Sequence, residues 1–275
     1  MTGTLYVVAT PIGNLADASP RAIETLRAVQ VIACEDTRTT RTLLAHYGIR
    51  ARTVALHEHN ERAGAQKLIA ELRQGKNIAL VSDAGTPALA DPGAWLVAEA
   101  HRAGIAVSPL PGPSAAAAAI SACGFAASRF LFAGFLPAQP AARRKALEAL
   151  DLPWPVVLYE APHRIAATLQ DLQARFGLER EIVIARELSK KFEEVARLPL
   201  GDAPGWLAAR AHRQQGEFVL VLAPGEERTA ESIDAERVLG VLLEALAPSE
   251  AAKLAARITG LPKSELYRRA LERAK

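Results

Sequence analysis

The sequence has little of what small secreted proteins and membrane proteins depend on. Cys34 and Cys123 are the only cysteines in 275 residues, too few for a disulfide framework. No window holds about 18 uninterrupted apolar residues, so no membrane-spanning segment is expected. The N-terminus shows no recognisable secretory signal. We therefore expect a cytoplasmic protein in which both cysteines are packing residues.

Three common motifs are absent as well. The pattern G-x-x-x-x-G-K-[ST] does not occur, which excludes a P-loop nucleotidase. The loop after the first apolar segment lacks G-x-G-x-x-G, which argues against dinucleotide binding. No G-x-S-x-G segment is present, which excludes the usual α/β-hydrolase.

The composition is that of an ordinary globular protein, with 50% hydrophobic and 23% charged residues. The net charge of +3 points to no particular partner, but the last 25 residues carry seven basic and two acidic side chains. This excess fits attraction to a polyanion such as nucleic acid, or simply a solvated helix face. The basic residues are Lys253, Arg257, Lys263, Arg268, Arg269, Arg273 and Lys275.

Short apolar runs alternate with helical stretches through the first 125 residues. This rhythm predicts an α/β domain with a mainly parallel sheet covered by helices. The expected strands are 4–9, 31–34, 53–56, 78–81 and 105–109, and residues 115–119 read as a small-residue helix.

A second α/β domain and a small helical piece are expected to follow. The second domain has expected strands at 130–133, 156–160, 182–187 and 216–222 and helices at 141–150, 163–176 and 205–214. After a linker at 223–228, residues 250–257 and 263–273 form two short helices around a Gly-Leu-Pro break. This pattern is typical of a helix-turn-helix, or of a simple helical hairpin. The expected domains are 1–115, 116–225 and 229–275.

Three loops of small residues follow apolar strands. Residues 10–14 (Thr-Pro-Ile-Gly-Asn), 82–87 (Ser-Asp-Ala-Gly-Thr-Pro) and 109–114 (Pro-Leu-Pro-Gly-Pro-Ser) each end such a run. Glycine and proline punctuate turns anyway. However, ligands in open α/β sheets bind beyond the carboxyl ends of the strands, so three such loops predict one small-molecule pocket.

Polar segments close other strands. Residues 35–38 (Glu-Asp-Thr-Arg) could supply a general base or a substrate clamp, and Asp36 could equally cap the helix at 37–47. Residues 57–60 (His-Glu-His-Asn) favour polar substrate contact over a metal, because no further ligand stands at a recognisable spacing. Residues 159–164 and 186–191 bring carboxylates together with Arg164 and Arg186, which could hold phosphates or form a salt-bridge network.

Taken together, eight segments resemble the tetrapyrrole methylase family, and within it the members that methylate ribosomal RNA. The segments occur in register from residue 4 to the basic C-terminal hairpin: 5–17, 35–38, 82–87 with 91–93, 111–115, 132–137, 159–164, 185–190 and 216–220.

The resemblance implies an S-adenosylmethionine-dependent methyltransferase. Its implied reaction is 2′-O-methylation of the ribose of cytidine 1402 in 16S rRNA, at the decoding centre. It further implies two α/β domains with the cofactor in a cleft between them, a homodimer, and 16S rRNA in the 30S subunit as the partner, with no membrane or DNA partner. No metal is expected.

The resemblance also assigns site residues. Those expected to hold the cofactor are Pro11, Asp83, Ala84, Gly85, Thr86, Ser114, Ala115, Tyr159, Ala185 and Glu217. Because a ribose hydroxyl is a weak nucleophile, a base is expected nearby: Asp36 first, then Glu187 or Lys190. The residues expected to contact RNA are Arg38, His59, Arg164, Arg186, Lys263, Arg268 and Arg269. No role is assigned to residues 88–90.

One departure separates the branches of the family. Corrin and sirohaem methylases usually carry a G-x-G-x-G-D first loop, whereas residues 10–14 here are Thr-Pro-Ile-Gly-Asn. This favours the RNA branch. Two alternatives stay open: methylation of a small tetrapyrrole, and an RNA-binding module without catalysis.

Overall fold

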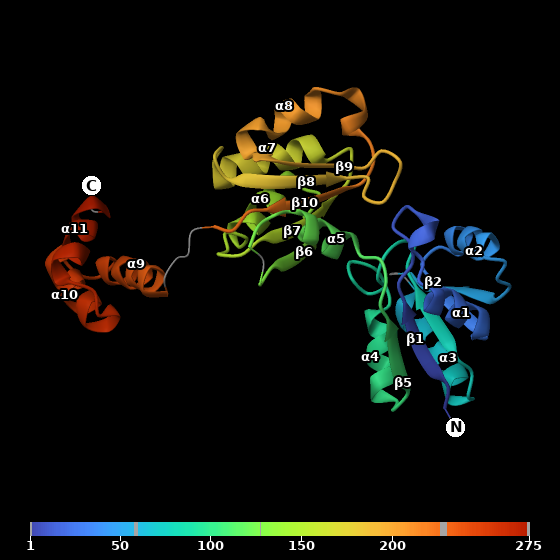
Figure 1. The fold of residues 1–275 in the computed structure, drawn as a ribbon. Helices are drawn as coiled ribbons and strands as arrows, with labels where there is room; N and C mark the ends of the chain where they lie inside the picture. The colour runs from blue at the N-terminus through green and yellow to red at the C-terminus, as the bar shows by residue number, and fades with distance from the viewer. Residues whose placement is uncertain (1, 58–59, 127, 226–229, 274–275) are drawn as a thin grey trace. The chain divides into compact units, whose positions relative to one another are not determined.

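The computed structural model describes residues 2–57, 60–126, 128–225 and 230–273, the last range without the side chains of 230–234. Its contacts divide the chain into two compact units, Met1–Pro224 and Gly225–Lys275. The first unit contains two five-stranded sheets, drawn in Figure 1. An expected domain boundary near residue 115, inside this unit, stays a prediction.

The first sheet is entirely parallel, with strand order β3-β2-β4-β1-β5. All four residues of β4 are buried, as the uninterrupted apolar run predicts for a central parallel strand. The strands are β1 (Thr4–Val8), β2 (Val31–Cys34), β3 (Arg52–Ala55), β4 (Ile78–Val81) and β5 (Ala106–Leu110).

Helices cover both faces of this sheet. Leu5 and Leu80 pack with Leu68 and Leu96 of α3 and α4 on one face. On the other face, buried strand residues pack against α1 and α2. The helices are α1 (Pro20–Ala28), α2 (Thr37–His46), α3 (Glu61–Arg73) and α4 (Ala94–Arg102).

The second sheet is mixed, with order β6-β7-β10-β8-β9. Only β6 and β7 pair in parallel; β7–β10, β10–β8 and β8–β9 are antiparallel. The strands are β6 (Leu131–Phe135), β7 (Val156–Glu160), β8 (Glu181–Arg186), β9 (Glu194–Pro199) and β10 (Phe218–Leu222). The helices are α5 (Ala115–Ala122), α6 (Pro140–Glu148), α7 (Ile165–Phe176) and α8 (Ala203–Ala208).

Two features of this second part differ from expectation. The strand β9 was not predicted: it follows a charged segment, alternates half-buried and exposed residues, and pairs on one side only. Its sequence therefore lacks the apolar run that marks the other strands. The helix expected at 205–214 is two short pieces, α8 and the 3₁₀ turn Ala211–Gln214.

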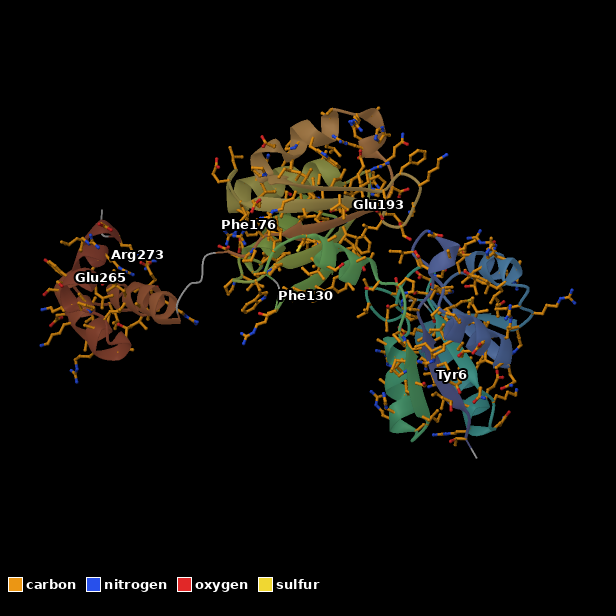
Figure 2. All side chains as sticks on the ribbon, viewed as in Figure 1. Tyr6, Phe130, Phe176, Glu193, Glu265 and Arg273 are labelled. Atoms are coloured by element: carbon orange, nitrogen blue, oxygen red, sulfur yellow. The ribbon has the colours of Figure 1, made fainter. Side chains whose placement is uncertain are left out.

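The C-terminal unit is helical, with α9 (Ala230–Leu243), α10 (Pro248–Thr259) and α11 (Lys263–Arg273). Gly260 ends α10 with a left-handed φ of 76°, a conformation that suits glycine at a helix C-terminus. Arg273 of α11, which is labelled in Figure 2, donates to the carbonyl of Glu236 in α9 at 3.1 Å. Across the described ranges, no helix combines the length and hydropathy needed to cross a membrane.

Candidate functional site

The loops after β1 and β4 are joined by backbone pairing. Thr10 and Gly85 exchange two hydrogen bonds, from the Thr10 amide to the Gly85 carbonyl at 2.8 Å and from the Gly85 amide to the Thr10 carbonyl at 3.0 Å. The hydroxyl of Thr10, which is buried, donates to the Ser82 carbonyl at 3.1 Å. The two loops therefore form one bridged unit at the carboxyl edge of the sheet.

The loop after β5 joins this unit. Thr86 donates its hydroxyl to the Pro113 carbonyl at 3.1 Å. A side chain at Gly112 would meet Ala9, because a Cβ there would lie 2.9 Å from the Ala9 Cβ. Glycine is thus required where the third loop crosses the end of β1. The expectation that the three small-residue loops converge is confirmed.

These loops border a cavity of about 520 Å³. This volume lies within the usual range for small-molecule sites, roughly 300–1,000 Å³. Its lining residues are Ile12, Glu35, Asp83, Ala84, Gly85, Thr86, Leu89, Asp91, Ser114, Ala115, Phe135, Tyr159, Glu160, Ala161, Pro162, His163, Ala185, Leu188, Glu217, Phe218 and Val219.

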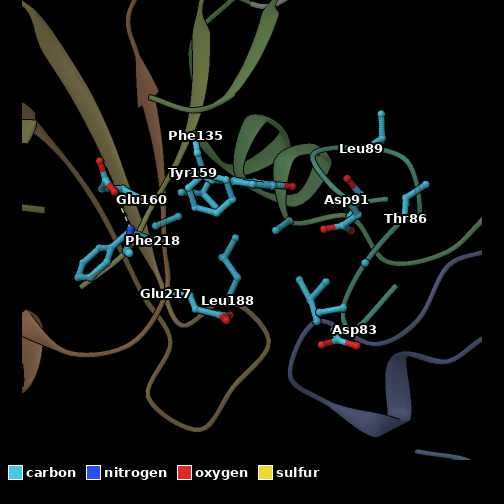
Figure 3. A pocket seen from close by; sticks show the side chains of 18 of the residues that line it. Asp83, Thr86, Leu89, Asp91, Phe135, Tyr159, Glu160, Leu188, Glu217 and Phe218 are labelled. Atoms are coloured by element: carbon cyan, nitrogen blue, oxygen red, sulfur yellow. Dashed lines mark hydrogen bonds between the residues drawn. The ribbon is translucent and has the colours of Figure 1, made fainter. Parts of the chain in front are cut away.

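The two sides of the cavity differ in chemistry. The loops of the first sheet contribute carboxylates and small residues, and the second sheet contributes mostly apolar and aromatic side chains. Figure 3 shows Asp83 and Asp91 across the cavity from Tyr159 and Phe135. Such a cavity suits a ligand with one apolar or aromatic part and one cationic part.

Tyr159 organises the aromatic side. Its ring meets Phe132 and Phe135 edge-on, with centroids 4.9 and 5.5 Å away. Its hydroxyl accepts a hydrogen bond from the Ala116 amide, at the start of α5, at 3.3 Å. Burial raises the pKa of Tyr159. The Phe135 ring remains more than half exposed and forms part of the wall.

Two carboxyl groups on the opposite side have raised pKa values. Burial, reinforced by the charges of Asp91 and Asp83, raises the pKa of Glu35. Burial also raises the pKa of Asp91, although a hydrogen bond with Ser82 opposes the shift. Glu35, Asp83 and Asp91 thus share the loop side of the cavity, where burial comes first and mutual repulsion second in raising the pKa values of Glu35 and Asp91.

Two leucines line the cavity from unusual backbone segments. Leu89 lies between Ala88 and Ala90, with φ of 64° and 66°, and Leu188 lies between Glu187 and Ser189, with φ of 52° and 68°. Within the ranges described, no other non-glycine residue has positive φ. Such strain clusters at functional sites. Leu89, in a segment given no role from sequence, is therefore part of the cavity lining.

Lys190, Glu187 and Glu217 form an ion network at the edge of the cavity, where Glu217 is part of the lining. Lys190 Nζ lies 2.8 Å from Glu187 Oε1 and 2.9 Å from Glu217 Oε2. Burial lowers the pKa of Lys190, but these two carboxylates outweigh it and raise the pKa overall. For Glu187, burial raises the pKa, but the hydrogen bond from Lys190 and the other contacts outweigh it, so the pKa of Glu187 is lowered overall. Both groups are thus held in their charged forms, which does not favour either as a proton acceptor.

Both oxygens of the Asp36 carboxylate bind Arg38. Asp36 caps α2 by accepting from the Arg38 amide at 2.7 Å, and the Arg38 guanidinium binds it through Nε and Nη2. These hydrogen bonds with Arg38 lower the pKa of Asp36 to about 2. Asp36 does not line the cavity. Asp36 therefore caps α2, which was one of the two roles expected for it. Its role as a base stays a prediction, and this geometry disfavours it.

The arginines expected to bind RNA have different surroundings. Arg164 donates to the Leu136 carbonyl at 2.6 Å and pairs with Glu160. Arg186 is buried and donates to the carbonyls of Gln215 and Phe192. Both guanidinium groups are engaged inside the fold, which disfavours a phosphate contact. Arg38 is exposed but paired with Asp36.

The remaining residues expected at the RNA lie elsewhere. His59 lies outside the described residues. Lys263 and Arg268 are exposed on α11 with no carboxylate partner among the described residues. Arg269 instead pairs with Glu265 and Glu236. Their role in RNA binding stays a prediction.

The cavity gathers nine of the ten residues expected to hold a cofactor; Pro11 is not in the lining, although its neighbour Ile12 is. Their roles stay predictions. Sequence reasoning missed Glu35, Asp91, Leu89, Phe135 and Leu188 as lining residues. All of these except Leu89 lay inside the quoted segments, so position alone could have found four of the five. In the residues described, no three His, Cys, Asp or Glu side chains are arranged to hold a metal ion.

Two family models match the chain. Residues 4–204 match the model described as tetrapyrrole (corrin/porphyrin) methylases, and residues 229–274 match the RsmI C-terminal HTH domain. Among solved structures, diphthine synthase aligns with a TM-score of 0.61 and 19% identity, covering 80% of this chain and 90% of that one. Uroporphyrin-III-C-methyltransferase from Thermus thermophilus aligns with a TM-score of 0.56 and 22% identity, covering 80% of this chain and 94% of that one. These two likenesses concern the fold.

Curated relatives are much more similar. Ribosomal RNA small subunit methyltransferase I of Pseudomonas aeruginosa is 49% identical over 98% of both chains. The protein of the same name from Escherichia coli O157:H7 is 48% identical, covering 98% of this chain and 95% of its own. The expected fold class, two α/β sheets with a helix-turn-helix-like C-terminal piece, is confirmed. The chain therefore belongs to the tetrapyrrole methylase family and, within it, to the ribosomal RNA small subunit methyltransferase I group.

Proposed function

We propose that this protein transfers a methyl group from S-adenosylmethionine to the ribose 2′-oxygen of cytidine 1402 in 16S rRNA. The observation that carries the proposal is the cavity at the bridged loops, in a chain about half identical to proteins named as ribosomal RNA methyltransferases. The match of residues 229–274 to a helix-turn-helix model supports a nucleic-acid substrate over a small tetrapyrrole.

The cavity fits the cofactor in size and in charge. When bound, S-adenosylmethionine supplies a methyl group on a positively charged sulfur. Asp83 and Asp91 would offset this charge, while the aromatic side around Tyr159 would cover an adenine-sized ring. Gly85, with φ of 81°, lets the loop backbone approach the ligand closely.

The chain's own residues would contribute chiefly by positioning. Thr10, Gly85 and Pro113 hold the three loops together before any ligand arrives, so little ordering is needed on binding. The apolar side chains of Leu188 and Phe218 would exclude water from the reacting oxygen. Holding the acceptor oxygen in line with the methyl carbon is the main demand of such a displacement.

The decisive experiment supplies labelled S-adenosylmethionine and 30S subunits that lack the modification. Nuclease digestion and mass spectrometry then identify the product. A 2′-O-methylated cytidine at the decoding site is the expected result. Cofactor binding without transfer to RNA would overturn the proposal, and methylation of a tetrapyrrole acceptor would point to the alternative.

The proposal extends to a homodimer that acts on 16S rRNA of the 30S subunit in the cytoplasm. Light scattering during size-exclusion chromatography tests the dimer. Transfer to purified 16S rRNA, compared with transfer to 30S subunits, tests which form of the RNA is the substrate.

A further inference from the structure

Glu35 stands apart from the other carboxylates of the cavity. It follows β2 directly, lines the cavity and is partly buried. In the described part of the chain, neither of its carboxylate oxygens has a hydrogen bond or ion pair. The others are engaged: Asp83 accepts from the Asp36 amide at 3.1 Å, Glu160 accepts from the Thr168 hydroxyl at 2.6 Å, and Glu217 pairs with Lys190.

The surroundings of Glu35 make its carboxylate a stronger proton acceptor than an ordinary glutamate. The charged groups that act on it come from three elements: Asp36 at the start of α2, Asp83 after β4, and Asp91 in the loop before α4. All three are acidic; Arg38 pairs with Asp36, but no cation among the described residues shifts the pKa of Glu35 itself. Together with burial, they raise the pKa of Glu35. A carboxylate whose pKa moves toward neutral accepts a proton more readily than one held near 2.

We propose that Glu35 is the catalytic base that accepts the proton of the ribose 2′-hydroxyl, an inference that rests on the proposed function. The O2′–H bond breaks and its proton moves to a carboxylate oxygen of Glu35. The electron pair left on O2′ forms the new bond to the methyl carbon, and the pair of the breaking carbon–sulfur bond stays on sulfur. The positive charge of the sulfonium is thereby exchanged for the proton that Glu35 takes up.

The other candidates are less suited to this step. The Asp36 carboxylate, with a pKa of about 2, already binds Arg38. Lys190 is held as an ammonium group, and Glu187 is held ionised by Lys190 and also accepts from the Glu217 amide at 2.9 Å. Only a group without such partners can take a proton without breaking a contact. Glu35 also costs the fold no hydrogen bond when it is replaced.

The test compares Glu35→Gln with Asp36→Asn, two neighbouring changes that each remove one negative charge at nearly constant size. Single-turnover methyl transfer is measured against pH, and the dissociation constants for cofactor and RNA are measured by calorimetry. For Glu35→Gln we expect a loss of about 100-fold or more in the transfer rate. Its dissociation constants should change by less than about threefold, and the acidic limb of the pH profile should disappear. Asp36→Asn should keep that limb.

A third variant and a direct titration give readouts that do not depend on loss of activity. Asp91→Asn removes a charge that raises the pKa of Glu35, so the acidic limb should move to lower pH. The carboxyl ¹³C signal of Glu35, identified as the one missing in Glu35→Gln, should titrate above the usual glutamate range.

Three outcomes would overturn the inference. Glu35→Gln could retain the transfer rate and the acidic limb; it could weaken cofactor binding as much as it slows transfer, which would make Glu35 a cofactor contact; or Asp36→Asn could abolish the limb. Failure of the wild-type protein to methylate RNA would instead overturn the proposed function itself, and the inference with it.

Discussion

Gly13 lies directly against the side chain of Lys190, so that a Cβ at Gly13 would come within 2.3 Å of the Lys190 Cγ. Gly13 belongs to the loop after β1, and Lys190 follows β8 of the second sheet. Ser189, next to Lys190, also hydrogen-bonds Asp17. The loop after β8 is thus fastened to the first sheet's loop beside the cavity.

Replacing Gly13 by alanine should displace Lys190 and weaken its ion pairs with Glu187 and Glu217. Overpacking of this kind typically lowers the free energy of unfolding by about 1–3 kcal/mol. Urea denaturation measures the change. Gly205→Ala is the matched control, since no atom lies within 4 Å of a Cβ there, and this helical position should tolerate or prefer alanine. Equal stability of both variants would show that Lys190 moves aside without cost.

Glu35→Gln should stabilise the protein at pH 8. Because the folded-state pKa of Glu35 is raised above its unfolded value of about 4.5, the folded state binds the proton more tightly. Glu35 therefore favours folding at low pH, and this stabilisation is lost as pH rises through the folded-state pKa. Glutamine cannot ionise, so the advantage of Glu35→Gln should appear above this pKa and vanish below about pH 4.

Denaturation midpoints measured from pH 4 to pH 8 test this expectation. Glu24→Gln, at an exposed position on α1, controls for the loss of one surface charge. A Glu35→Gln variant that is destabilised across the whole range would mean that the carboxylate forms favourable contacts in the fold.

Ala88→Gly and Ala90→Gly should each stabilise the fold. An alanine with φ near 65° is strained, and glycine adopts this conformation freely. The expected gain is about 1 kcal/mol per site. Ala70→Gly in the middle of α3, where the backbone is helical, should instead lose roughly 0.5–1 kcal/mol. If all three changes destabilise the protein equally, the loop conformation around Leu89 is not the one described.

Lys263→Gln and Arg268→Gln should each weaken RNA binding and reduce its salt dependence. Each phosphate contact removed should lower the slope of log K against log salt by about 0.7–0.9. Filter binding at several salt concentrations measures the slope. Arg269→Gln is the comparison, because Arg269 pairs with Glu265 and Glu236. Its loss should mainly lower the stability of the C-terminal unit and should change the salt slope little. Unchanged slopes for Lys263 and Arg268 would remove this face of α11 from the RNA interface.

The sequence predicts a strand or helix well where a single pattern marks it, such as an apolar run or a regular alternation of strands and helices. The apolar run at 78–81 and the alternation of strands and helices place every strand of the first sheet within one residue of its observed ends. The strand β9 escapes prediction because its stability comes from pairing with β8, through six residue pairs, rather than from an apolar run.

The sequence predicts which segments contribute to the site, but it does not predict which side chains of a segment line the cavity. The segment 35–38 was expected to supply a base, a clamp or a helix cap, yet the sequence could not tell that Asp36 binds Arg38 at the start of α2 while Glu35 lines the cavity. The same limit applies to Arg164 and Arg186, whose guanidinium groups bind main-chain carbonyls. Such contacts depend on loops that come together only in the folded chain.

The paired amides of Thr10 and Gly85 have a consequence for motion. Neither hydrogen bond can open unless the loops after β1 and β4 separate together, so both amides should exchange with solvent at a common rate. A ligand that contacts one loop should then also slow amide exchange in the other loop, even where it does not touch that loop. The two paired loops would open and close as one unit. Hydrogen exchange would therefore report a bound ligand at positions several residues away from it.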